Sequence, residues 1–416
     1  MTVNCASMTS MQYDHPDATH LIHHPYTPPA GFEAPQPGVF KASTVYFPNV
    51  AAMRLREWKD KSAYTYGLHG TPTTYLLEER LCALEGGRQC VLVPSGLAAI
   101  ANVSLALLKS GDEVLIPDNA YGPNKTLAEG QLQPWGIGHA HYDPMNPADL
   151  AARITARTRL VWLEAPGSVT MEFPDLAALV RCCRERGVLC ALDNTWGAGL
   201  AFKPFDLLGD DSLGVDISVH ALTKYPSGGG DVLMGSVMTR DEGLHLKIKL
   251  CHMRLGLGVG GNDVEMVLRS LPSMALRYAA QDQTGRALAH WWDRQPQCVQ
   301  VLHPALATSP GHGHWQALCM HDGQAGSAAG LFSVMLDARY RQAQIDAFCD
   351  GLDCFRIGYS WGGPVSLVMP YDLTSMRSSW PEHVRRGTLI RFSVGLESTQ
   401  ALLSDLQRSL KKHLSV

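Results

Sequence analysis

The sequence predicts an α/β protein with a mostly parallel sheet, and three observations indicate this fold class. Short apolar runs typical of strands alternate with segments of helical periodicity from residue 88 to about residue 240. After residue 298 the pattern becomes a looser mixture of strands and helices, which suits a smaller α+β domain. The chain of 416 residues is also long enough for two domains and a large core.

The N-terminal segment, residues 1 to about 60, is rich in Pro, His and Thr and shows little periodicity, so we expect an extended arm. Its histidines and Cys5 lack the usual spacing of zinc ligands, which favours a polar arm over a metal site. A short helix capped by Asn49 is expected within residues 49–60. A second helix is expected from Thr73 to Leu84, because its leucines share one face.

The alternating region predicts a regular order of elements. Strands are expected at residues 91–93, 113–117, 137–142, 159–164, 188–193, 215–219 and 232–238. Helices are expected between them at residues 97–108, 123–132, 147–155 and 175–186. This rhythm is typical of a mostly parallel sheet that helices cover on both faces.

The C-terminal part begins with a glycine-rich hinge at Gly256–Gly261 and a long helical region, residues 262–295, which Pro272 interrupts. Strands are then expected at residues 330–336 and 388–394, and helices at residues 341–349 and 398–414. We therefore expect three parts: an arm (1–64), a large domain (65–260) and a small domain (261–416).

Composition argues against several classes of function. The net charge is −4 and no basic run is present, so nucleic-acid binding has no electrostatic support. No apolar stretch approaches the roughly 20 residues that span a bilayer, and Met1–His24 lacks the pattern of a signal peptide. The 11 cysteines are scattered through apolar patterns, as at Cys90 and Cys190. Reduced thiols of this kind are typical of a cytosolic protein, so we expect a cytoplasmic location.

One lysine, Lys224, has neighbours that set it apart from a solvated surface lysine. It follows a predicted strand, stands between Thr223 and Tyr225, and precedes a run of three glycines. A lysine amine held in a cavity can bind a carbonyl group covalently. Asp193 ends an earlier predicted strand, and the carboxyl ends of such strands meet at one crevice of the sheet. Pyridoxal 5′-phosphate (PLP) requires this pair, with the acid facing its ring nitrogen.

The turn at Ser95 and Gly96 is a candidate phosphate site, because it joins a predicted strand to the start of a helix. A helix N-terminus offers free N–H groups and the positive end of the helix dipole. Many turns share this pattern, so it gains weight only together with Asp193 and Lys224. No Walker loop is present, and no G-x-G-x-x-G follows an early strand, so a nicotinamide cofactor is not expected.

Five motifs occur in the order found in a known family. They are Glu164–Glu172 (EAPGSVTME), Asp193–Trp196 (DNTW), Thr223–Tyr225 (TKY), Tyr359–Gly363 (YSWGG) and Gly387–Arg391 (GTLIR). With them the chain, from about residue 38 to its C-terminus, resembles the Cys/Met-metabolism family of PLP-dependent enzymes. The resemblance implies fold type I, in which a large domain has a mostly parallel seven-stranded sheet between helices and a smaller C-terminal domain is α+β.

The resemblance implies roles for the cofactor residues. Lys224 resembles the lysine that binds PLP and then moves the Cα proton, and Asp193 resembles the partner of the ring nitrogen. Tyr121 resembles the tyrosine that stacks on the ring and assists catalysis, with a packed core aromatic as the alternative. The phosphate would be held by Ser95, Gly96, Leu97, Thr223 and, from a neighbouring subunit, Tyr66.

On the substrate side, Arg391 resembles the arginine that binds the substrate carboxylate through two hydrogen bonds, with a sheet-edge cation as the alternative. Ser360 and Trp361 would line the substrate site, and Ser168 would lie near the phenolic oxygen of PLP. Trp361 favours the cystathionine β-lyases of this family. Relatives that act at the γ-carbon usually carry another residue there, and a Glu where Val365 stands.

The implied activity is cleavage of L-cystathionine, or a related cysteine S-conjugate, to a thiol (homocysteine), pyruvate and ammonia. Cystathionine γ-lyase, cystathionine γ-synthase, methionine γ-lyase and a PLP-binding protein without turnover stay open as alternatives. The resemblance also implies a homo-oligomer, at least a dimer and by family a tetramer of two dimers. No metal, nucleic acid or membrane partner is expected.

Three positions depart from the family pattern. Leu68 stands where relatives often carry an Arg for the phosphate, so either His69 or another cation replaces it or the site binds the cofactor more weakly. Ala221 stands where relatives often have Ser, and Gly229 where they often have His. None of these positions carries the expected chemistry, so we expect the reaction to be kept.

Overall fold

The computed structural model describes residues 19–415, except residues 25, 27, 33, 60 and 321–325. Its larger sheet has seven strands in the order β1-β7-β6-β5-β4-β2-β3. They are β1 (Gln89–Val93), β2 (Glu113–Pro117), β3 (Gly138–Tyr142), β4 (Thr158–Glu164), β5 (Leu189–Asp193), β6 (Ile217–His220) and β7 (Gly235–Thr239). Strands β2 to β6 pair in parallel, whereas β7 runs antiparallel to β1 and β6. The predicted mostly parallel sheet is confirmed.

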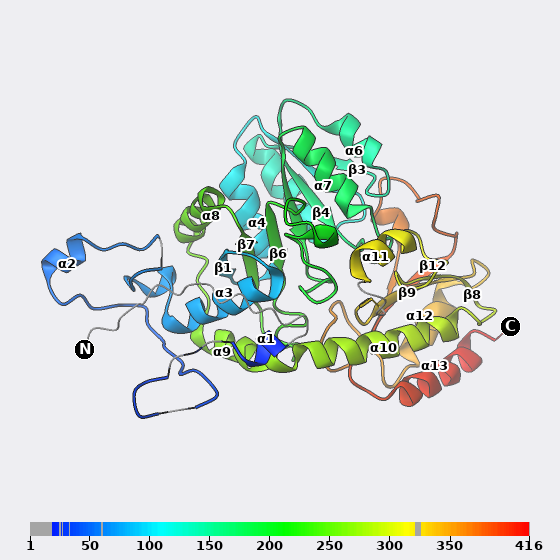
Figure 1. The fold of residues 1–416 in the computed structure, drawn as a ribbon. Coiled ribbons are helices and arrows are strands. Elements are labelled where there is room, and N and C mark those ends of the chain that lie inside the picture. Colours follow the sequence, from blue (N-terminus) through cyan, green and yellow to red (C-terminus); the bar gives the residue numbers. More distant parts are fainter. Residues whose placement is uncertain are drawn as a thin grey trace.

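Helices cover both faces of this sheet (Figure 1). They are α3 (Pro72–Glu85), α4 (Gly96–Leu107), α5 (Gly122–Leu127), α6 (Pro147–Arg153), α7 (Leu176–Glu185) and α8 (Glu242–Leu255). Strand β1 shows why both faces must be covered, because Cys90 and Leu92 belong to one core cluster and Val91 and Val93 to another. Successive side chains of a strand point to opposite faces, and here both faces are apolar.

A second sheet has five strands in the order β10-β11-β12-β9-β8. They are β8 (Cys298–Leu302), β9 (Leu331–Leu336), β10 (Arg356–Ile357), β11 (Leu367–Tyr371) and β12 (Thr388–Ser393). Its helices are α11 (His312–Cys319), α12 (Gln342–Asp350) and α13 (Thr399–His413). The sequence analysis did not assign β8, β10, β11 or α11. A separate apolar core lies in this part of the molecule, which agrees with the expected second unit.

Two helices connect the sheets along one side of the molecule (Figure 1). Helix α9 (Gly261–Ser270) is followed by a 3-10 turn (Leu271–Ser273) and by α10 (Met274–Trp292). The predicted interruption at Pro272 is therefore present. Helix α8 ends at Gly256, which adopts a left-handed conformation with φ of 66°. The domain limits at residues 64 and 260 stay a prediction.

In the N-terminal segment, α1 (Thr19–Ile22) packs on the body of the molecule with Leu21 in the main core, whereas the stretch with α2 (Val50–Arg54) extends away from the two sheets (Figure 1). Asn49 caps α2 as predicted, because its Oδ1 accepts the N–H of Ala52 at 2.8 Å. Cys5 lies outside the described residues, and the described cysteines are free thiols. Within the described ranges, no helix combines the length and the apolar character needed to cross a bilayer.

Candidate active site

Lys224 lies in the loop between β6 and β7, and its side chain contacts a loop of the second sheet. The Nζ donates to Ser360 Oγ at 2.8 Å and lies 5.5 Å from the centroid of the Trp361 ring. Burial and then the charge of Arg391 lower the pKa of the amine to about 8, although Asp193 acts in the opposite direction. A large fraction of Lys224 is therefore neutral near pH 8, and the neutral amine is the nucleophilic form.

Asp193 ends β5 and is joined to the Lys224 loop through one hydroxyl group. Its Oδ1 accepts the Thr195 hydroxyl at 2.5 Å and the Thr195 N–H at 3.1 Å. The same hydroxyl oxygen accepts the N–H of Ala221 at 2.9 Å. Burial raises the pKa of Asp193, whereas Thr195, His220 and Lys224 favour its charged form. The structure therefore brings the predicted acid and lysine together at the carboxyl end of the sheet.

A buried hydrogen-bonded cluster supports the turn that carries Asp193. His220 Nδ1 lies 2.8 Å from Glu85 Oε1, and both side chains are fully buried. Glu85 Oε2 accepts from Ser218 Oγ at 2.6 Å and from Asn194 Nδ2 at 3.0 Å. The sequence analysis missed this cluster, since only the folded chain brings the end of α3 beside β5 and β6.

Tyr121 and Glu164 lie beside Asp193 on the side of β4. The Tyr121 N–H donates to Glu164 Oε2 at 2.8 Å, and Glu164 is the register partner of Asp193 on the neighbouring strand. Burial and then the charge of Asp193 raise the pKa of Glu164 well above its usual value. Tyr121 is 41% exposed, so the alternative of a packed core aromatic is wrong. Glu164 opened a family motif, but the sequence assigned it no role in the site.

The start of α4 provides the expected anion site. Ser95 is the N-cap of α4, and the N–H groups of Gly96 and Leu97 precede the first i→i−4 hydrogen bond of the helix. A Cβ atom at Gly96 would lie 2.6 Å from the Cβ of Ala221, so only glycine allows the helix to meet the Lys224 loop. The Thr223 hydroxyl makes two long hydrogen bonds of 3.3 Å to the backbone just before β7.

Tyr66 lies at the junction with the N-terminal arm. It forms a β-bridge with Thr44, its ring lies 5.9 Å from that of His69, and it is 47% exposed. The described contacts do not place it in the Lys224 cluster of its own chain. Burial and then Lys249 lower the pKa of His69, so this imidazole is neutral at pH 7.

Arg391 lies in the middle of the second sheet, on β12 between β11 and β9, so the sheet-edge alternative is wrong. It is 7% exposed, and its guanidinium lies 5.2 Å from the ring centroid of Tyr371. Within the described part of the chain it forms no ion pair. A buried cation without an acidic partner is costly, so this guanidinium is suited to an anion that arrives with a ligand.

The loop with Ser360 and Trp361 packs directly on the Lys224 loop. The Trp361 ring meets the Tyr225 ring edge-on at 5.5 Å between centroids. Gly362 has φ of +76°, and a Cβ there would lie 3.0 Å from the Tyr225 nitrogen. Glycine at this position therefore allows the loop to approach the Lys224 backbone closely.

Ser168 lies in the turn after β4, where its N–H donates to the C=O of Asn119 at 2.9 Å. The side chain of Asn119 is buried, and neither amide atom has a partner among the described residues. Gly167 leaves room for this amide, because a Cβ there would lie 1.9 Å from Asn119 Nδ2. Asn119 thus offers an unused donor and acceptor two residues before Tyr121, and the sequence analysis missed it.

Comparisons with known proteins agree with this arrangement. The family model for the Cys/Met metabolism PLP-dependent enzymes matches residues 18–411. The chain belongs to this family. It is 34% identical over 399 residues to the cystathionine β-lyase of Bordetella avium, covering 94% of this chain and 96% of the relative. It is 33% identical over 349 residues to an L-alanine/L-glutamate racemase of Wolbachia pipientis wMel, covering 84% of this chain and 83% of the relative.

Among solved structures, the chain is similar to cystathionine γ-synthase of Xanthomonas oryzae pv. oryzae in complex with aminoacrylate and cysteine. The TM-score is 0.83 at 28% sequence identity, with 96% of this chain and 99% of that chain covered. Proteins similar to this chain therefore carry names for different activities.

The cofactor of this family is PLP, and the residues of the chain fit it. Lys224 offers an amine, Asp193 an acid for the ring nitrogen, and the start of α4 free N–H groups for a phosphate. The unpartnered amide of Asn119 offers hydrogen bonds to a further polar group. These donors converge from three strand ends and one helix start.

A network of charges fastens the loop between β11 and β12 to the large sheet near Tyr121. Arg377 Nη2 lies 2.7 Å from Glu172 Oε1, and the Asp118 carboxylate accepts the Ser378 hydroxyl at 2.9 Å. Although burial opposes it, Arg377 holds the pKa of Glu172 well below its usual range. Residues of the second sheet are thus fixed close to the site.

Proposed function

We propose that this chain is a PLP-dependent carbon–sulfur β-lyase that cleaves L-cystathionine, or a related cysteine S-conjugate, to a thiol, pyruvate and ammonia. The observation that carries the proposal is the position of Lys224, whose lowered pKa reflects burial and the opposed charges of Arg391 and Asp193. The relative named cystathionine β-lyase supports the choice of substrate. Trp361, beside the Lys224 amine, supports cleavage at the β-carbon.

Two groups of the chain would orient an amino-acid substrate. Arg391 would bind the substrate carboxylate through two parallel hydrogen bonds. This carboxylate would be the anionic partner that Arg391 lacks among the described residues. Lys224 would hold the cofactor through its amine, beside the substrate Cα. Bound PLP supplies an electron sink for the substrate Cα, and Asp193 would stabilise positive charge at the ring nitrogen.

Lys224, once released, would act as the base that removes the Cα proton, because an amine with a pKa of about 8 is readily neutral. Burial and then the charge of Asp193 raise the pKa of Tyr121, so its hydroxyl stays protonated. Tyr121 or the protonated Lys224 would give a proton to the sulfur as the C–S bond breaks. The thiol leaves, and the three-carbon enamine, once free, is hydrolysed by water to pyruvate and ammonia.

Product analysis tests this proposal. Purified holoenzyme with L-cystathionine should release pyruvate and homocysteine in equal amounts. Release of 2-oxobutanoate and cysteine would instead assign a γ-acting enzyme. Racemisation of L-alanine or L-glutamate without thiol release would assign the reaction that the Wolbachia relative is named for. Bound cofactor without any of these reactions would support a binding protein.

We also propose that the enzyme is a homo-oligomer, at least a dimer and by family resemblance a tetramer, in the cytoplasm. Large apolar side chains of the arm are exposed in the single chain, at 50% for Phe40, 91% for Tyr46 and 80% for Leu55. Such a surface is suited to burial against a second copy. Tyr66, exposed beside the arm, would then reach the phosphate site of that copy. Light scattering at monomer mass with full activity would contradict this proposal.

A further inference from the structure

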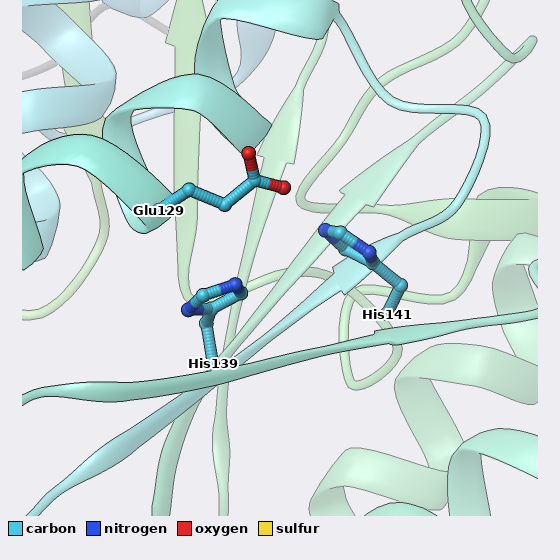
Figure 2. Close-up of side chains that lie close together, drawn as sticks. All are labelled: Glu129, His139 and His141. Atoms are coloured by element: carbon cyan, nitrogen blue, oxygen red, sulfur yellow. The ribbon is translucent and has the colours of Figure 1, made fainter. Parts of the chain in front are cut away.

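A cluster of possible metal ligands lies at the edge strand of the large sheet, where β4 and β2 separate it from β5 and Asp193. One ligand atom each from Glu129, His139 and His141 lies within 4.8 Å of the others (Figure 2). Strand β3 is the last in the sheet and pairs with β2 alone. No residue of this cluster takes part in the reaction proposed above, so the two can be tested separately.

The two histidines share one face of β3. Side chains two positions apart on a strand point to the same side, and the imidazole centroids are 5.8 Å apart. The side chains of His139 and His141 are both half-buried. An ion could therefore reach both rings from solvent.

Glu129 comes from a different element and faces the histidines. It lies in the π-helix Ala128–Leu132, which continues α5, and its carboxylate points toward both imidazoles (Figure 2). Turns of π-helix inside α-helices occur frequently at functional sites. Within the described part of the chain, Glu129 forms no ion pair. Its negative charge is thus available to a cation.

The His141 ring has a nitrogen atom that is free to bind a metal ion. Its Nε2 is buried and has no hydrogen-bond partner among the described residues. A buried polar atom without a partner is unfavourable, and a metal ion would satisfy it. Lys125 and Asp118 are the other charged groups that act on His141, in opposite directions. The Lys125 amine is itself held by Asp118 at 3.0 Å, which offsets much of its charge.

We propose that Glu129, His139 and His141 bind a divalent transition-metal ion, for which Zn²⁺ is the best match. Two imidazoles and one carboxylate suit Zn²⁺, Ni²⁺ and Cu²⁺ and do not suit Mg²⁺ or Ca²⁺. Tetrahedral Zn²⁺ with bonds of about 2.0–2.2 Å needs ligand atoms roughly 3.4 Å apart, so the exposed Glu129 closes over the ion. Water takes the fourth position. The ion then ties β3 to the helical segment that begins after Tyr121.

Calorimetric titration of the reduced holoenzyme with ZnCl₂ tests this site. The wild-type chain should bind one Zn²⁺ ion. His139→Ala and His141→Ala should each bind Zn²⁺ at least about tenfold more weakly than the wild type. Glu129→Gln should also weaken binding. His290→Ala, which removes an exposed histidine of α10, should bind as the wild type does. If the wild type and both histidine variants bound Zn²⁺ equally, the ion would lie elsewhere, for example on thiols, and the proposal would be wrong. Absence of Zn²⁺ binding by the wild type would also overturn it.

A second measurement guards against a variant that folds poorly. Without metal, the unfolding temperature of the half-buried His139→Ala should match that of the wild type. Added Zn²⁺ should raise the unfolding temperature of the wild type and of His290→Ala only, because it binds the folded state. In crystals soaked with Zn²⁺, an anomalous peak among the three side chains is expected. A peak only at cysteine sulfurs would contradict the assignment.

Discussion

Replacing Arg391 by leucine separates a role in binding substrate from a role in holding the fold. The guanidinium is 7% exposed and has no acidic partner in the described part of the chain. Desolvation of such an ion costs several kcal/mol, and the nearby Tyr371 ring returns about 1–2 kcal/mol of cation–π attraction. We therefore expect Arg391→Leu, without substrate, to be at least as stable as the wild type.

The effect on catalysis should be the opposite. Two hydrogen bonds from a guanidinium to a carboxylate, at about 1.5–3 kcal/mol each, contribute roughly 3–6 kcal/mol to transition-state binding. Their loss should lower kcat/KM for L-cystathionine by roughly two to four powers of ten. Arg391→Lys keeps the charge but not the planar fork, so it should fall between the wild type and the leucine variant.

Steady-state pyruvate release and thermal unfolding, measured on the same samples, check both expectations. Arg356→Leu is the matched control, because Arg356 is exposed on β10 of the same sheet. It should change neither quantity. If Arg391→Leu lost stability in proportion to activity, the arginine would be structural. A kcat/KM within about twofold of the wild type would show that no carboxylate binds there.

Three further predictions concern the cofactor residues. Asp193→Asn cannot carry the charge that faces the ring nitrogen, so kcat should fall at least about a hundredfold with cofactor still bound; an unchanged kcat would refute this role. Gly96→Ala places a Cβ 2.6 Å from that of Ala221 and should weaken PLP binding in equilibrium dialysis, whereas Gly313→Ala, with open space around it, should not. In cofactor-free protein, folding lowers the pKa of Lys224 from 10.5 to about 8, so the unfolded chain binds more protons between these values and stability should rise with pH there. Urea unfolding should show this rise in the wild type and a smaller one in Lys224→Met.

Much of the larger sheet could be predicted from the sequence, because its strands are continuous apolar runs with apolar residues on both faces. The strand that ends at Asp193 and the loop with Lys224 were found in this way. The second sheet was harder. Strand β11 contains Pro370, which argues against a strand, and β8 is irregular around Val299. Helix α11 has only eight residues, including Gly313.

The site itself was only partly accessible to sequence reasoning. Lys224 and Asp193 could be named because their chemistry is unusual in its local context, and Arg391 was named from the family resemblance. Glu164 and Asn119 could not, since a carboxylate at a strand end and an amide in a turn are common. Their significance lies in burial and in missing partners, which exist only once the strands are paired.

The account depends most on Lys224 as the residue that binds PLP, and borohydride reduction of the holoenzyme followed by peptide mass mapping tests this directly. Reduction should fix the cofactor permanently on the peptide that contains Lys224. Lys203 is an internal comparison, because it too is buried, with a lowered pKa, yet it is held by the carbonyls of Leu84 and Gly199. Cofactor mass on the Lys203 peptide, or on no lysine peptide, would contradict the assignment of the site.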